Sequence, residues 1–316
     1  MPKVSVIIPT YNRSNVVKET ISSVLAQTKL DLEVIVVDDG STDDTSKVVE
    51  GLQDGRVSYF YKINGGAASA RNLGLSKCEG EYVAFLDSDD FWPAHYIEVM
   101  VSHLENNSEF GAVYSPITVM YPDGSKVKSY KMPKGKSGWI TLDLFRNSFV
   151  WPSAVVFRGS VWKDFYFDEL LKRSYEDSDA FLRLSMYTQF LFVPEVEALY
   201  RISADSISSE VGVACTRILV LERFYFELGG DKVIPAKIAR RRLSHSCRKV
   251  AEDRRRTGAR AAALGLFRRA IRHWPYDLRL YLGLLRVLLL SSSKDQNPNW
   301  KMPQPLGHPL GTNRFG

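Results

Sequence analysis

The chain has few cysteines and no long apolar run. Of its 316 residues only three are cysteines, Cys78, Cys215 and Cys247, and none of them forms a C-x-x-C motif. This usage excludes a disulfide scaffold and favours a reducing compartment. No stretch reaches the roughly 18 apolar residues that a membrane-spanning helix needs, because the longest candidate, residues 278–290, is interrupted by two arginines. The apolar run at the N-terminus is too short for a signal peptide, so we expect a cytoplasmic protein.

Positive charge is scarce in most of the chain and concentrated near its end. The net charge of +6 results from 42 Lys and Arg against 36 Asp and Glu. Residues 1–229 carry a net charge of −8, whereas residues 230–290 carry +12 and are rich in leucine. The length suits one large domain with an appendage. We therefore expect an acidic main domain at residues 1–210, a basic helical region at 211–290 and a loosely ordered tail at 291–316.

Short apolar runs alternate with helix-like segments through the first 90 residues. These runs occupy residues 3–9, 32–37, 57–62 and 82–86, and helix-forming segments separate them. Runs without polar alternation are typical of strands in a parallel sheet that is covered on both faces. The sequence therefore predicts an α/β fold with a mostly parallel sheet flanked by helices, followed by a C-terminal helical region.

From about residue 111 the pattern becomes mixed. We expect a short helix at residues 140–146, a further helix that begins close to Asp177, and helices throughout residues 211–290. A turn at residues 121–125 and a basic, loop-like stretch at residues 126–136 separate the other elements. Apolar runs predict further strands at residues 112–120, 150–157, 190–193 and 197–202.

Three carboxylates follow the apolar run at residues 82–86. Asp87, Asp89 and Asp90 lie within four residues, and burying such a cluster without partners would be costly. Ligands of open α/β sheets bind at the carboxyl ends of strands, and oxygen ligands suit Mg²⁺ or Mn²⁺. A divalent metal site is therefore one interpretation of the D-x-D pair. The pair alone is equally compatible with a solvated acidic turn.

Polar or glycine-rich segments also follow the other expected strands. Asp38 and Asp39 end the second strand, and a glycine-rich stretch that includes Gly66 opens a helix of small residues. The backbone of such a helix can approach a ligand closely. Arg71 lies on this helix and has the length to contact a phosphate. The alternatives are structural: Asp39 caps the next helix, and Arg71 pairs with a surface carboxylate.

Five motifs stand in a characteristic order along the chain. They are VSVIIPTYNR, VVDDGSTD, NGGAASARNLGL, GEYVAFLDSDD and YEDSDAFLR. Together they resemble the family 2 glycosyltransferases, nucleotide-sugar-dependent enzymes of the GT-A fold, over residues 1–205. The resemblance implies an inverting transferase that moves a sugar from a nucleotide-diphosphate sugar, with a UDP-sugar favoured, to an acceptor hydroxyl. A glycan, a polysaccharide or a lipid-linked saccharide is the implied acceptor, as in polysaccharide and cell-envelope biosynthesis.

The resemblance also implies roles for matching positions. It makes Asp177 the catalytic base and assigns a divalent metal, Mn²⁺ or Mg²⁺, to Asp89 with Asp87. Without the resemblance, Asp177 and Glu176 would be an acidic pair at a helix N-terminus. Where many relatives carry a histidine after the last strand, this chain has Ser203, which puts a metal ligand from that loop in doubt. The implied nucleotide-sugar contacts are Pro9, Thr10, Tyr11, Arg13, Asp38, Asp39, Gly66, Arg71, Asp87 and Ser88.

Two other functions remain open on the sequence. A nucleotidyltransferase would carry a glycine-rich loop after the first strand, where this chain has Pro9 to Arg13. A non-enzymatic binding protein could use the basic end, but no nucleic-acid motif is present and no nucleic-acid partner is expected. Basic amphipathic helices also bind anionic lipid surfaces, so peripheral contact with the inner face of a membrane is expected. The alternative is a bundle whose leucines pack on the body or on a second subunit.

Overall fold

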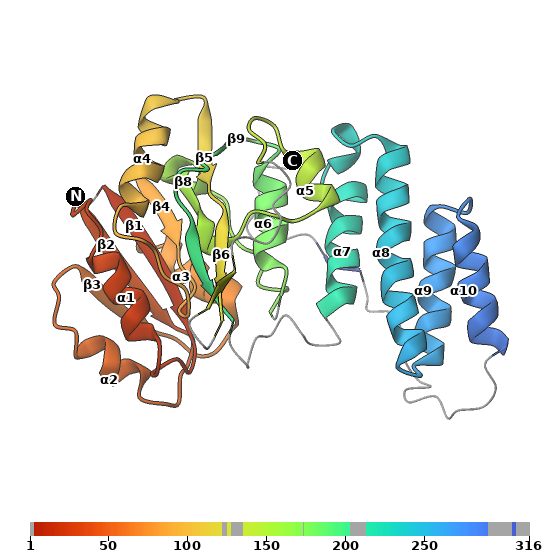
Figure 1. The fold of residues 1–316 in the computed structure, drawn as a ribbon, viewed down its shortest axis with the longest axis horizontal. Helices are drawn as coiled ribbons and strands as arrows, with labels where there is room; N and C mark the ends of the chain where they lie inside the picture. Colours follow the sequence, from red (N-terminus) through yellow and green to blue (C-terminus); the bar gives the residue numbers. More distant parts are fainter. Residues whose placement is uncertain are drawn as a thin grey trace. The chain divides into compact units, whose positions relative to one another are not determined.

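The computed structural model describes residues 3–121, 125–127, 135–172, 174–202, 213–289 and 305–307. The chain divides into two compact units, and the described residues up to 202 belong to the first, those from 213 to 307 to the second. Ser203, most of the basic stretch 126–136 and most of the tail 291–316 lie outside the described residues. In Figure 1, where colour follows the sequence, the elements up to β9 belong to the first unit and helices α7 to α10 to the second.

The first unit is built on a seven-stranded sheet with the order β3-β2-β1-β4-β8-β5-β9. The first four strands pair in parallel. β8 is antiparallel to both of its neighbours, while β9 is parallel to β5. The sheet is therefore mixed but mostly parallel, as predicted (Figure 1). The strands are β1 (Val4–Thr10), β2 (Leu32–Asp38), β3 (Val57–Tyr61), β4 (Tyr82–Phe85), β5 (Phe110–Tyr114), β8 (Val155–Arg158) and β9 (Gln189–Phe192).

Helices pack on this sheet because alternate strand residues point to opposite faces. Val6 and Ile8 belong to one apolar cluster with residues of α1 and α4, whereas Ile35 and Val37 belong to another with α3. Gly74 lets α3 lie close to the sheet, since a Cβ there would be 2.4 Å from Ile7. The helices are α1 (Val17–Leu25), α2 (Thr45–Glu50), α3 (Ala67–Leu75), α4 (Tyr96–Asn106), α5 (Thr141–Arg146) and α6 (Glu176–Leu184).

A second sheet has three strands in the order β10-β6-β7. Its strands are β6 (Ile117–Met120), β7 (Lys126–Val127) and β10 (Ala198–Arg201). The single strand predicted at residues 112–120 was wrong, because the structure divides it into β5 and β6. Pro116, which has no N–H to donate to a ladder, lies at the division. The strand predicted from residue 150 likewise begins as a 3₁₀ turn, Pro152–Ala154, before β8.

The second unit is helical, as predicted for this region. Its core joins residues of all four of its α-helices, among them Ile218, Cys247, Phe267 and Leu280. Among the described residues, no helix is long and apolar enough to cross a membrane. The helices are α7 (Val213–Phe226), α8 (Ala236–Arg256), α9 (Arg260–His273) and α10 (Leu278–Leu289), with a 3₁₀ turn at Gly230–Lys232.

Candidate active site

The loops after β1, β2 and β4 meet at one edge of the sheet, where the parallel strands end. The Asn12 backbone N–H donates to Ser41 Oγ at 2.8 Å, and Asn12 Oδ1 accepts from the Thr42 N–H at 2.8 Å. Arg13 Nε lies 3.8 Å from Asp89 Oδ2. The structure thus brings Arg13 and Asp89 together, although 76 positions separate them along the chain. This edge is where open α/β sheets bind ligands.

The residues at the end of β1 differ in exposure. Pro9 and Thr10 are buried, and Thr10 Oγ1 has no hydrogen-bond partner among the described residues. The Tyr11 side chain is 47% exposed, so its ring is open to solvent. An exposed aromatic face beside a polar loop can stack against a flat base.

The paired aspartates after β2 organise loops rather than cap a helix. Asp38 accepts hydrogen bonds from the Ser41 N–H at 2.7 Å and from Tyr59 Oη at 2.7 Å. Asp39 accepts from the N–H groups of Gly65 and Gly66 at 2.9 and 2.7 Å. The helix-cap alternative for Asp39 is therefore wrong, because its carboxylate binds the loop before α3 instead.

Gly66 stands at a position that only glycine fills without strain. Its φ is +92°, and a Cβ there would lie 2.5 Å from the Lys172 carbonyl oxygen. Its N–H donates to Asp39. The structural role of Gly66 is therefore to shape the turn that leads into α3. Lys62 Nζ also contacts Asp39, at 2.7 Å. A carboxylate offers about four acceptor sites, and these three donors leave about one.

The D-x-D loop after β4 holds two partly exposed carboxylates. The side chains of Asp87 and Asp89 are 34% and 22% exposed. Ser88 between them is buried, and its carbonyl accepts from Thr20 Oγ1 at 2.9 Å. Burial, followed by the charge of Asp87, raises the pKa of Asp89. The loop therefore carries negative charge that its neighbours do not fully offset.

Asp90, the third carboxylate, is buried and links the D-x-D loop to neighbouring segments through hydrogen bonds. It is 1% exposed and accepts from Ser153 Oγ at 2.6 Å and from the Arg201 N–H at 3.1 Å. Ser153 Oγ also accepts from the Asp87 N–H at 3.1 Å. Sequence reasoning missed Ser153 and Arg201 as parts of this site. The only signal for them was the Trp-Pro-Ser sequence before β8 and the Tyr-Arg sequence of β10.

Arg71 joins the D-x-D loop to the start of α6. Its Nη2 lies 2.8 Å from Asp87 Oδ1, and its Nη1 lies 2.7 Å from Glu176 Oε1. The guanidinium is buried, with its side chain only 4% exposed. The alternative of a surface ion pair is therefore wrong, since both partners belong to the site. Glu176 is a site residue that the sequence analysis treated only as a neighbour of Asp177.

Asp177 lies in the first turn of α6, and its pKa is shifted. Its Oδ1 accepts from the Ser178 N–H at 2.6 Å. Burial, followed by the charge of Glu176, raises the pKa of Asp177 to about 7. Tyr175, directly before the helix, has a φ of 67°, a left-handed conformation that is uncommon for a residue other than glycine. Such strain collects at functional sites.

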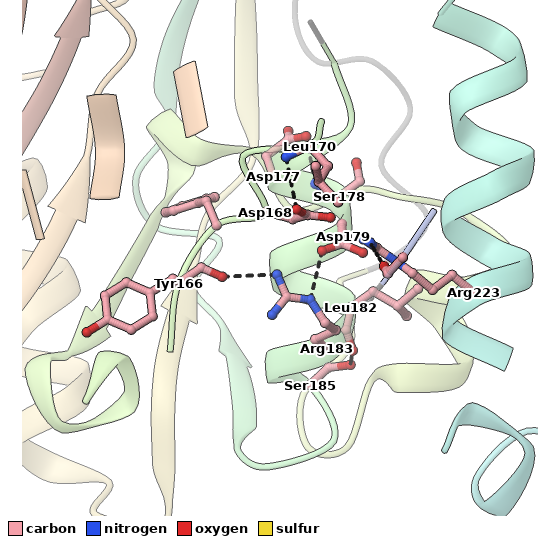
Figure 2. Close-up of polar contacts among 12 residues, drawn as sticks. Tyr166, Asp168, Leu170, Asp177, Ser178, Asp179, Leu182, Arg183, Ser185 and Arg223 are labelled. Atoms are coloured by element: carbon pink, nitrogen blue, oxygen red, sulfur yellow. Dashed lines mark hydrogen bonds and ion pairs between the residues drawn. The ribbon is translucent and has the colours of Figure 1, made fainter. Parts of the chain in front are cut away.

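The rest of α6 contains a buried ion pair (Figure 2). Arg183 Nε donates to Asp179 Oδ2 at 2.7 Å, and Arg183 Nη2 donates to the Tyr166 carbonyl at 3.0 Å. Both members of the pair are fully buried. The pair lies within α6, so the contact that ties the helix to another part of the chain is the hydrogen bond from Arg183 to the Tyr166 carbonyl.

The D-x-D carboxylates fit a divalent cation by their chemistry. Asp87 and Asp89 supply oxygen donors of the kind that Mg²⁺ and Mn²⁺ prefer, and they remain partly accessible. Burial, followed by the charge of Asp87, raises the pKa of Asp89, and a cation bound here would favour the ionised form.

A second cluster of ligand-type residues lies in the helical unit. Glu222, Cys247 and His273 bring one potential ligand atom each within 4.8 Å of the others. Glu222 is already bound by Arg269 through both oxygens and by His273 Nε2 at 2.7 Å. This cluster is an ion-pair network between helices, and a cation there would have to compete with Arg269.

The family follows from the comparison with known sequences. Residues 5–172 match the model of "Glycosyl transferase family 2", which is more than half of the chain. The chain belongs to this family. The predicted family, the transferase class and the GT-A-type fold are therefore confirmed.

Relatives and solved structures of the family match this chain over different extents. An uncharacterised glycosyltransferase of Rickettsia bellii is 50% identical over 107 residues, which is 34% of this chain and 16% of the relative. Chondroitin synthase of Pasteurella multocida is 33% identical over 194 residues, 60% of this chain and 20% of that protein. The matches thus cover a fifth or less of these relatives' own length.

A solved structure matches over most of its length. Residues 1–349 of TarS from S. aureus, in complex with UDP-GlcNAc, give a TM-score of 0.59 at 21% identity, over 86% of this chain and 89% of that one. At this identity the similarity shows a shared fold.

Proposed function

We propose that the first unit transfers a sugar from a nucleoside-diphosphate sugar to an acceptor hydroxyl, with inversion at the anomeric carbon. The observation that carries this proposal is the pair of contacts that Arg71 makes. It binds Asp87 of the D-x-D loop and Glu176, and Glu176 directly precedes Asp177, whose pKa is about 7. A site with two partly exposed carboxylates and a further carboxylate that titrates near neutrality suits a displacement on a diphosphate sugar.

The chain's own residues have separate tasks in this mechanism. Asp177, when ionised, takes the proton of the acceptor hydroxyl as that oxygen attacks the sugar. Arg71 holds Asp87 and Glu176 in place on either side of the reacting groups. A single displacement with the base opposite the leaving group inverts the anomeric centre, by the same logic as in inverting glycosidases.

A divalent cation, Mn²⁺ or Mg²⁺, is proposed to bind at Asp89 and Asp87. When bound, it would supply a Lewis acid for the charge of the leaving diphosphate. Arg13, 3.8 Å from Asp89, adds a fixed positive charge beside this position.

The donor contacts are proposed to come from the same edge of the sheet. Tyr11 would stack on the base, and the buried Thr10 hydroxyl and Asp39 would bind the nucleoside, with Asp38 holding their loops. Pro9, Gly66 and Ser88 would shape the walls. The UDP-GlcNAc complex of the TarS neighbour favours a UDP-sugar as donor.

The proposed acceptor is a saccharide or a lipid-linked saccharide. The name of the Pasteurella relative, chondroitin synthase, supports a role in polysaccharide formation. We further propose a cytoplasmic location with peripheral contact to the inner face of an anionic membrane, because residues 230–290 carry a net charge of +12. The two-unit division after residue 208 supports separate catalytic and membrane-contacting parts.

Removing one D-x-D carboxylate tests the metal proposal. Binding of UDP-GlcNAc, measured by calorimetry, is expected to strengthen at least tenfold when Mn²⁺ replaces EDTA, and Asp89→Asn is expected to lose that gain because it removes a charged ligand. Asp44→Asn is the matched control, since Asp44 is a surface carboxylate with a side chain 69% exposed. Equal affinity in EDTA and in Mn²⁺ for the unaltered protein would contradict the proposal.

The rate of transfer is expected to depend on pH around neutrality. Because the base must be ionised and its pKa is about 7, kcat/KM should rise with pH and level off above that value. At pH 6 it should be about tenfold below the plateau. A profile that stays flat down to about pH 5 would instead indicate a carboxyl of ordinary acidity. Donor affinity measured across the same range separates an effect on binding from one on the base.

A further inference from the structure

Helix α10 has two apolar faces, and only one of them is used within the unit. Leu280, Gly283 and Val287 are buried against the rest of the helical bundle. Gly283 allows close contact with α9, because a Cβ there would lie 2.4 Å from the Phe267 ring. Figure 1 shows α8, α9 and α10 side by side, with α10 in dark blue. This first face is sufficient to hold α10 in the bundle.

The second face of α10, here called the outer face, is apolar and open to solvent. At 100° per residue its members fall within an arc of about 120° that is opposite the buried face. Their side chains are between 43% and 76% exposed. Single exposed leucines are ordinary, but a continuous apolar face on one helix marks an interaction surface. The outer face consists of Leu278, Tyr281, Leu282, Leu285, Leu288 and Leu289.

The charges around the outer face are cationic. Neither α9 nor α10 contains an acidic residue. Arg279 and Arg286 lie on α10 at one border of the outer face, and both are exposed. Arg260 Nη2 donates to the Leu288 carbonyl at 3.2 Å, at the C-terminal end of the helix. Asp277, directly before the helix, is bound by Arg279, so the negative charge of its carboxylate is offset.

Aromatic residues stand at the N-terminal end of the same helix. The rings of Trp274 and Tyr276 are 5.1 Å apart in an edge-to-face arrangement, and Tyr276 is 78% exposed. Arg241 lies over the Trp274 ring at 5.4 Å. Tryptophan and tyrosine favour the boundary between water and lipid, because they combine an apolar ring with a polar group.

We infer that the outer face of α10 inserts into the interfacial region of an anionic lipid bilayer, with the helix lying along the surface. The leucines would contact the acyl chains, and the aromatic residues would lie among the headgroups. The bordering arginines would bind the lipid phosphates. The inference rests on the proposed peripheral membrane contact and names the element that makes it. A second copy of the chain fits less well, because a symmetric contact through α10 would bring arginines together with no acidic residue on the face to pair with them.

Vesicle binding by the full chain tests this inference. The probes are vesicles of phosphatidylcholine alone and of phosphatidylcholine with roughly one third phosphatidylglycerol, and the readout is sedimentation. The unaltered chain is expected to bind the anionic vesicles and to release with added salt. The double variant Leu282→Glu/Leu285→Glu should bind at least tenfold more weakly. The matched control Leu30→Glu/Ile63→Glu alters two exposed apolar residues of the first unit and should bind like the unaltered chain.

A second pair of variants examines the charge. Arg279→Gln/Arg286→Gln is expected to weaken binding to anionic vesicles by about fivefold for each arginine. Far-ultraviolet circular dichroism checks that every variant keeps its helices. None of these measurements involves donor or acceptor, so they stand or fall independently of glycosyl transfer.

Three results would overturn the inference. If the unaltered chain stays in the supernatant with anionic vesicles at low salt, it makes no membrane contact. If the Leu282→Glu/Leu285→Glu variant binds as well as the unaltered chain, another part of the protein binds lipid. If light scattering detects a dimer that the same variant abolishes, and the unaltered chain binds no vesicles, the outer face covers a second copy.

Discussion

Asp177→Asn is expected to lower turnover by roughly a hundredfold or more, the usual contribution of a positioned base, while donor affinity stays within about twofold. The amide keeps the shape and one acceptor oxygen, so the hydrogen bond from Ser178 can persist. What it removes is the ability to take a proton from the acceptor hydroxyl. Initial rates with saturating donor, together with calorimetric donor binding, measure the two effects separately.

Asp143→Asn is the matched control for this substitution. Asp143 also lies in the first turn of a helix, α5, and contacts Lys136 rather than the site. If Asp177 served only to interact with the helix dipole, the two variants would lose similar, small amounts of stability, about 0.3–1 kcal/mol, and neither would lose its turnover. Unchanged turnover in Asp177→Asn would remove this residue from the mechanism.

Arg71→Met is expected to destabilise the first unit by about 3–5 kcal/mol, since breaking a buried ion pair leaves its partner uncompensated. The guanidinium joins Asp87 to Glu176, and Glu176 is itself only 8% exposed. Methionine fills similar space without charge, so the loss measures the charge and not a cavity. Chemical denaturation followed by tryptophan fluorescence, compared with the unaltered chain, gives the change.

Two further variants separate the causes of that loss. Arg56→Met removes an arginine from a more exposed pair with Asp54 and is expected to cost about 1 kcal/mol or less. Adding Glu176→Gln to Arg71→Met should restore part of the stability, because the unpaired buried charge is then gone. If Arg71→Met proved as mild as Arg56→Met, the bridge would not be holding the D-x-D loop and α6 together.

Periodicity and composition predicted the first half of the fold well. The apolar runs around Val6, Val34 and Val83 became β1, β2 and β4, because strands buried on both faces leave a clear apolar signature. Parallel strands end at the same edge of the sheet, and there the structure brings Arg13 Nε to 3.8 Å from Asp89 Oδ2. The five motifs also predicted the family that the comparison confirmed.

Later elements were predicted less well, because their signals are short. The run at residues 112–120 is mostly apolar, and only Pro116 indicates that it divides into two strands in different sheets. Likewise, Asp90 was one acidic residue among three, and nothing local indicated that Ser153 would reach it across 63 positions. The role of Glu176 was missed for the same reason, since its partner Arg71 lies far away in the chain.

The sequence alone therefore determined the strand and helix types, the order of the motifs and the excess of positive charge in the last helices. These follow from local pattern, in which each residue's neighbours along the chain carry the information. Tertiary structure decided which carboxylate pairs with Arg71 and which remains open, because pairing depends on distance in space. It also decided which leucines of α10 are buried: the segment is apolar around most of its circumference, and only its packing on α9 through Gly283 left the outer face exposed.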